Sequence, residues 1–203
     1  MPRTLEFDRD RALIRAMKLF WSQGYKATSL NALLQAMQIQ RSSFYASFGD
    51  KRSLFIECLA LFGSRTAALA LTDQPDNETA ERLIWAFFTA TLLDVPESRR
   101  GKGCLLVNTI LEMADTDDEL CALSAQQLAA VESAFEQALT LAQAQGRWTL
   151  NMTPAQGARY LMTINQGLRV QSRKKLSRQS IWATLENALA LMGLPPQETP
   201  AHV

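Results

Sequence analysis

Helix-breaking residues occur in only a few places along this chain of 203 residues. Its 9 glycines and 7 prolines are grouped, and Ala, Leu, Gln, Glu and Arg dominate the long stretches between them. Those five residue types favour helices, whereas glycine and proline disfavour the helix interior. No extended strand-like alternation and no repeat stands out. The sequence therefore predicts an all-α fold of about nine helices.

Composition argues against several classes of protein. Hydrophobic residues make up 47% of the chain without forming an 18-residue apolar run, which argues against both a disordered chain and a membrane protein. The first residues lack the apolar stretch of a signal peptide, so we expect a cytoplasmic protein. Three widely spaced cysteines, Cys58, Cys104 and Cys121, and a single histidine, His202, argue against a disulfide framework and a metal site. No cofactor is expected.

The charge of the chain is distributed unevenly. Residues 1–55 carry nine basic and four acidic side chains, a net charge of +5, while the remaining residues carry −4. This asymmetry indicates that the N-terminal quarter meets a polyanion, although a solvated basic face would give the same count.

Two amphipathic helices are predicted in the N-terminal quarter. Apolar residues recur at i, i+3, i+4 and i+7 over residues 9–22, and Gly24 is expected to end this helix in a left-handed conformation. Thr28 is the expected N-cap of a second, shorter helix with the same spacing. The apolar residues of the two helices are Leu13, Ala16, Met17 and Phe20, then Leu30, Leu33, Leu34 and Met37.

A third short helix follows after only three residues, which predicts a helix-turn-helix. Its apolar residues Phe44 and Phe48 are four apart, on one face. The opposite face presents Gln40, Arg41, Ser43 and Tyr45. Arginine can bind a guanine edge or a phosphate, so these side chains suit a DNA groove. For Tyr45, inward packing beside Phe44 is the alternative.

Residues 20–55 resemble the DNA-binding domain of the TetR/AcrR family of bacterial repressors. The matching motifs are Phe20-x3-Gly24-Tyr25-x2-Thr28-Ser29-Leu30, Phe44-Tyr45-x2-Phe48 and Lys51-x2-Leu54-Phe55. The resemblance implies a helix-turn-helix DNA-binding domain over residues 1–55. Its implied DNA contacts are Thr28, Ser29, Gln40, Arg41, Ser42, Ser43, Tyr45 and Lys51. Gln38 stands where the family usually has glycine, so we expect it to adopt a left-handed conformation.

Longer helices are predicted over the rest of the chain. The first runs to Asp94 from a cap at Asn77 or Thr79, and others cover about residues 104–113 and 117–145. The sequence Thr153-Pro154-Ala155-Gln156 is a helix-start signal, and a last helix runs to Met192. The basic run 173–175 before that helix is either a solvated loop or a second nucleic-acid contact.

The resemblance implies that residues 56–203 form an effector-binding and dimerisation domain. Candidates for the effector pocket are Phe88, Cys104, Asn108, Glu112, Met162 and Asn165. The alternative is that Phe88 and Met162 are ordinary core, and that Asn108 and Glu112 are satisfied structural polar groups. The family dimerises through its last two helices, and small residues alternate with Leu and Met on the final helix. The expected interface residues are Ile181, Leu185, Ala188, Leu189 and Met192.

Cys104 has two interpretations. At the start of a helix near Arg100 and Lys102, its thiolate would be stabilised, as in a thiol-based sensor. Alternatively, it is a small buried apolar residue, because free cysteines are often buried.

The predicted function is that of a homodimeric transcriptional regulator, a repressor released from its operator by a small-molecule effector. Its partners are double-stranded operator DNA, an unknown effector and a second copy of the chain, with no membrane. The alternative is a helical enzyme or small-molecule carrier without DNA binding. The chain has no HExxH motif and no Gly-rich phosphate loop, so we do not expect an enzyme.

Overall fold

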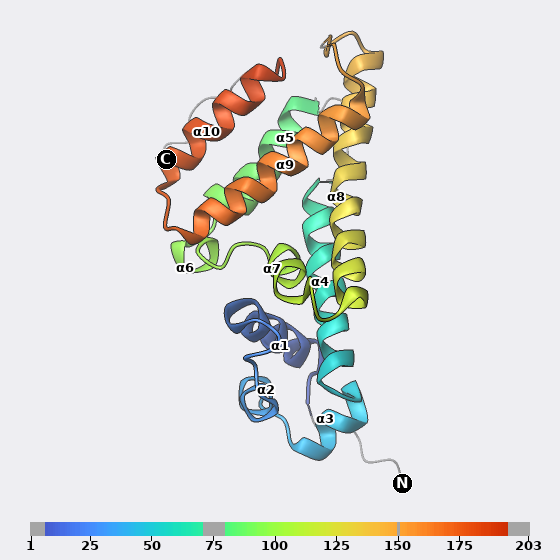
Figure 1. Cartoon of the computed structure of the whole chain (residues 1–203), viewed down its shortest axis with the longest axis vertical. Helices are drawn as coiled ribbons and strands as arrows, with labels where there is room; N and C mark the ends of the chain where they lie inside the picture. Colours follow the sequence, from blue (N-terminus) through green and yellow to red (C-terminus); the bar gives the residue numbers. More distant parts are fainter. Residues whose placement is uncertain (1–6, 71–79, 150, 195–203) are drawn as a thin grey trace. The chain divides into compact units, whose positions relative to one another are not determined.

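The computed structural model describes residues 7–70, 80–149 and 151–194. Within these ranges the chain forms ten α-helices, one π-helical turn and no strand, which confirms the all-α prediction. The helix beyond the expected nine is the four-residue α6. The elements are α1 (Arg9–Gln23), α2 (Leu30–Met37), α3 (Arg41–Phe48), α4 (Lys51–Ala70), α5 (Ala80–Phe88), η1 (Thr89–Leu93), α6 (Glu97–Arg100), α7 (Leu105–Met113), α8 (Asp118–Ala144), α9 (Pro154–Arg173) and α10 (Arg178–Leu191) (Figure 1).

The helices are divided between two compact units that do not follow the chain linearly. The first unit combines Met1–Ser64 with Leu105–Gln127, and the second combines Arg65–Cys104 with Leu128–Val203. Helix α7 and the start of α8 therefore belong with the N-terminal helices. The sequence analysis divided the chain by function, into a DNA-binding domain before residue 56 and an effector-binding domain after it. That functional division stays a prediction.

The core of the first unit is built on the predicted apolar stripe of α1. Leu13, Ala16, Met17 and Phe20 are all buried. The ring of Phe20 meets that of Phe55 on α4 edge to face, with centroids 4.7 Å apart. Edge-to-face contacts add to the free energy gained by burying the rings. This core holds the short helices α2 and α3, which are too short to be stable alone.

Helix α4 is long and apolar enough to cross a membrane by length and composition, with a mean hydropathy of 1.4. Its hydropathy has a simpler source within the first unit. The apolar side chains Phe55, Cys58, Leu59 and Phe62 are buried against the protein core.

Aromatic side chains form the centre of the second unit. Phe87 and Phe88 of α5 contact Phe135 of α8, and Trp85 packs against Trp182 of α10 with centroids 4.8 Å apart. The sequence predicted one continuous helix to Asp94, but its last turn is the π-helical η1. The two candidate caps of this helix, Asn77 and Thr79, lie outside the described residues.

Helices α9 and α10 contact each other in the second unit (Figure 1). Helix α9 begins with the predicted capping box, in which Thr153 and Gln156 each accept the other's backbone N–H. On α10 the structure corrects the predicted dimer interface. The residues expected at the dimer interface are all buried inside the protomer: Ile181, Leu185, Ala188, Leu189 and Met192. Side chains already covered by their own chain cannot offer surface to a second copy, so the outward face of α10 must be considered instead.

Candidate nucleic-acid interface

Helix α2 begins one residue later than the sequence predicted. Ser29, not Thr28, is the N-cap, and its hydroxyl accepts the N–H of Ala32. Thr28 is fully buried, and its hydroxyl donates to the carbonyl of Gly24 at 2.6 Å. The expectation that the Thr28 hydroxyl contacts DNA is therefore corrected, because that group is inside the protein and already bonded. Ser29 is exposed.

The turn between α2 and α3 depends on one strained residue. Gln38 has φ of 60° and ψ of 44°, the left-handed conformation expected from the sequence. For a residue with a side chain this conformation costs about 1–2 kcal/mol. Arg15 of α1 donates to both the side-chain oxygen of Gln38 and the carbonyl of Met37. These bonds from α1 offset part of the strain and hold the turn without glycine.

Helix α3 presents a polar outward face. Phe44 and Phe48 are buried, which fixes the rotation of the helix. Tyr45 is 49% exposed, so its ring points outward, not into the core. Arg41 is exposed at the first position of the helix, and its Nη2 donates to Asn31 Oδ1 on α2 at 2.9 Å. Of the other residues predicted to contact DNA from this face, Gln40 and Ser42 are exposed and Ser43 is half-buried.

Lys51 lies at the start of α4, after a cap formed by Asp50, whose carboxylate accepts the N–H of Ser53 at 2.7 Å. The ammonium of Lys51 lies 4.4 Å from the centroid of the Tyr25 ring. Partial burial lowers the pKa of Lys51, and Glu112 opposes the shift. The ring restrains the side chain at a helix N-terminus, a position where phosphates bind well.

Glu112 of α7 holds the turn that follows α1. Its two carboxylate oxygens accept the backbone N–H groups of Tyr25 at 2.9 Å and Lys26 at 2.7 Å. The approach is close: a Cβ at Gly24, where φ is +81°, would lie 2.7 Å from Glu112 Oε2. The turn therefore needs glycine for both its conformation and this contact. The carboxylate of Glu112 is committed to the helix-turn-helix, which removes this residue from the predicted effector pocket.

A second polar contact joins α4 to the start of α8. Arg52 Nη2 lies 3.1 Å from Asp117 Oδ1 and 2.8 Å from Glu119 Oε2. The N–H of Leu120 and the guanidinium of Arg52 together hold the pKa of Asp117 below its ordinary value. Arg52 is thus used inside the unit and is not a free cation for DNA.

We expect Glu112→Gln to lower the free energy of unfolding by about 1–2 kcal/mol, because a neutral amide replaces a carboxylate that accepts two backbone N–H groups. Chemical denaturation measures the change. Glu136→Gln, at an exposed position of α8, is the matched control. Equal stabilities of the two variants would contradict the role given to Glu112.

The predicted effector-pocket residues are divided between the two units. Phe88, Cys104, Met162 and Asn165 are buried in the second unit. Asn108 is half-buried on α7, in the first. The pocket stays a prediction for these five residues.

Sequence reasoning missed a buried arginine in the second unit. Arg169 is 7% exposed, and its Nε donates to Asn165 Oδ1 at 3.4 Å. Burial lowers the pKa of this guanidinium, and the neighbouring Cys104 opposes the shift. The signal was available, since Arg169 and Ser172 continue the i, i+4, i+7 spacing of the buried face from Asn165.

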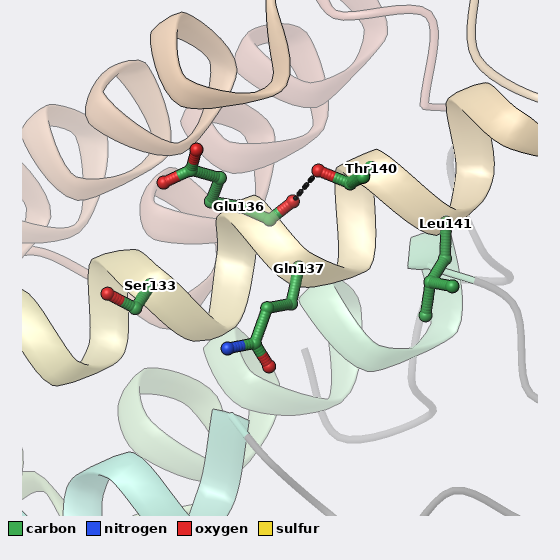
Figure 2. A pocket seen from close by; sticks show the side chains of 5 residues that line it. All are labelled: Ser133, Glu136, Gln137, Thr140 and Leu141. Atoms are coloured by element: carbon green, nitrogen blue, oxygen red, sulfur yellow. Dashed lines mark hydrogen bonds between the residues drawn. The ribbon is translucent and has the colours of Figure 1, made fainter.

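A hollow of about 510 Å³ lies along α8. Its described lining consists of Ser133, Glu136, Gln137, Thr140 and Leu141, all from this one helix (Figure 2). The Thr140 hydroxyl donates to the carbonyl of Glu136 within the helix. Binding sites usually bring together groups from several elements, so these residues carry no argument for a ligand.

Comparison with known proteins places the helix-turn-helix in a described family. Residues 13–58 match the family model "Bacterial regulatory proteins, tetR family", and residues 80–187 match "Tetracyclin repressor-like, C-terminal domain". The HTH-type transcriptional repressor ComR of Escherichia coli is 28% identical over 91% of this chain and 89% of its own length. The uncharacterized HTH-type transcriptional regulator YezE of Bacillus subtilis is 31% identical over 72% of this chain and 75% of its own.

A solved structure extends the similarity to a DNA complex. A variant of the TetR-family regulator CifR with three cysteine substitutions, bound to a 26-base-pair operator, superposes with a TM-score of 0.70. It is 28% identical, and the alignment covers 95% of this chain and 99% of CifR.

Proposed function

The chain belongs to the tetR family of bacterial regulatory proteins and is a DNA-binding transcriptional regulator, and from this premise we propose that it acts as a homodimeric repressor that a small-molecule effector releases from its operator. The family is one of transcriptional regulators, which are not a class of enzymes.

The observation that carries the DNA-binding proposal is the outward face of α3. Its side chains are polar and exposed, while its two phenylalanines anchor the helix from behind. A recognition helix needs this combination, because base contacts must be made from a fixed backbone. We assign Arg41, Gln40 and Ser42 to the major groove, and Tyr45 and Lys51 to the DNA backbone.

For dimerisation we propose the outward faces of α9 and α10. The middle of this surface is uncharged and consists mostly of small residues, with Val170 and Leu191 as its larger apolar members, the latter 76% exposed. The exposed Arg159 and Arg173 lie towards the two ends of α9. Small side chains let helices approach closely. The exposed residues of this middle part include Thr163, Gly167 and Val170 on α9, and Ala183, Thr184, Asn187, Ala190 and Leu191 on α10.

Release follows from the geometry of two linked recognition helices. A dimer must meet two half-sites about 34 Å apart or somewhat more. An effector can bind more tightly when the two recognition helices are held at a spacing that does not fit the operator. It then lowers operator affinity by the ratio of its affinities for the two arrangements of the dimer.

The test is a gel shift on DNA flanking the gene for this protein, with a shuffled fragment of equal length as control. Retardation of the flanking fragment at protein concentrations about 10³-fold below those needed for the control is the expected result. Equal retardation of the two fragments would refute sequence-specific binding.

A reactive thiol is a second candidate for the effector response. Cys104 precedes α7 and interacts electrostatically with the buried guanidinium of Arg169. The thiolate is the reactive form of a cysteine. Cys104 is only 4% exposed, as the alternative of a small apolar residue requires.

We expect iodoacetamide to label Cys104 in the native protein faster than Cys58. Cys58 is fully buried, and burial raises its pKa. Labelling of the three cysteines is followed by mass spectrometry, with Arg169→Met as the variant that lacks the neighbouring cation. If Cys104 reacts no faster than Cys58 and Cys121, the thiol interpretation is rejected and Cys104 is structural.

A further inference from the structure

A basic hollow of about 450 Å³ lies in the second unit, between the α6–α7 connection and the C-terminal end of α9. Its volume is in the range of small-molecule sites. Its lining consists of Glu97, Ser98, Arg100, Gly101, Lys102, Ser172, Arg173, Lys175 and Leu176. Four of these side chains are cationic and one is anionic, so the lining carries a net charge of +3.

Arg100 is the unusual member of this lining. It is 8% exposed, and its Nη1 has no hydrogen-bond partner among the described residues. Burial lowers the pKa of this guanidinium, nearby Arg178 lowers it further, and Glu97 opposes the shift. A buried cation with an unsatisfied donor destabilises a protein unless an anion or acceptor is supplied.

The position of Arg100 is fixed by α9. Ser172 is buried, and its hydroxyl donates to the backbone carbonyl of Arg100 at 3.0 Å. At Gly103, where φ is +70°, the chain passes so close to α9 that a Cβ would lie 3.2 Å from the Arg173 side chain. The guanidinium is therefore held on a packed backbone, and binding a ligand there needs little ordering of the site.

We propose that this hollow binds a small anion with a phosphate or carboxylate group, which Arg100 holds with Arg173 and Lys175. An arginine fork matches the paired oxygens of both groups, and the surrounding lysines add charge at longer range. The hollow is concave and its central cation is buried, which suits a small ligand better than the convex backbone of a DNA duplex. The basic run 173–175 thus borders a ligand site.

The experiment measures binding without DNA, so its outcome is separate from that of the operator test. Thermal unfolding of the full chain is followed with increasing phosphate or acetate, while chloride keeps the ionic strength constant. A ligand that binds only the folded protein raises the melting temperature with a saturable concentration dependence. The response to phosphate against that to acetate identifies which of the two groups the site takes.

Three variants give the test its controls. Arg100→Met, which removes the buried cation, and Arg173→Gln, at an exposed position, are each expected to weaken anion binding about tenfold. Arg159→Met makes a similar change on α9 outside the hollow and should bind as the parent does. Arg173→Gln decides the matter if Arg100→Met fails to fold.

Two results would overturn the proposal. One is the lack of a saturable response to either anion in the parent protein. The other is an Arg173→Gln variant that keeps the anion response but loses affinity for operator DNA, which would make the basic run a DNA contact.

Discussion

Replacing Arg41 by alanine is expected to weaken operator binding by about 30-fold or more while the fold stays intact. A lost contact to a base costs about 1–3 kcal/mol, and the proposed dimer would lose it in both half-sites. The free protein loses little, because Arg41 is exposed and its one described bond is to Asn31 on the adjacent helix. Surface substitutions of this kind usually change stability by less than about 0.5 kcal/mol.

Fluorescence anisotropy with operator and random DNA at one salt concentration measures the effect. A guanine contact predicts that the ratio of the two affinities falls, whereas a phosphate clasp predicts a uniform loss on both DNAs. We expect the ratio to fall. Arg147→Ala removes the same charge from an exposed position in the second unit and controls for general electrostatics. Operator affinity within a factor of two of the parent would show that Arg41 does not face the groove.

Replacing Gly167 by arginine is expected to convert the proposed dimer into folded monomers and to remove high-affinity operator binding. Gly167 lies on the outward face of α9, where an added Cβ would meet no atom within 4 Å. The protomer therefore accommodates the change, and replacing glycine within a helix gains about 0.5–1 kcal/mol of helix propensity. In the proposed interface, each protomer would bury a new unpaired cation, at a cost of several kcal/mol.

Sedimentation velocity measures the assembly, and thermal unfolding checks the protomer. Ala129→Arg, also a change from a small residue to arginine at an exposed helical position, is the matched control on α8. A Gly167→Arg protein that still sediments as a dimer would exclude this surface. A charge at Leu185 would not answer the question, because Leu185 is fully buried and its replacement would disrupt the protomer core.

The sequence by itself was sufficient for the local features of this protein. The stripe of α1 and the capping box of α9 follow from spacings of a few residues. The left-handed Gln38 was expected from the family resemblance. Helical periodicity, backbone conformation and capping depend on neighbours within one or two turns, which a sequence displays directly. The family resemblance rests on features of this kind.

Only the tertiary structure showed which helix faces pack together and which polar groups contact each other. The spacing on α10 marked a stripe but not whether it faced the protomer or a partner, since both are apolar environments. Glu112 was a pocket candidate from the family resemblance, but its contact, the N–H of Tyr25, is 87 positions away in the chain. Arg100 lies between the predicted helices in the sequence, yet its side chain is only 8% exposed in the structure. Such pairings depend on how distant segments pack together, and no local spacing records them.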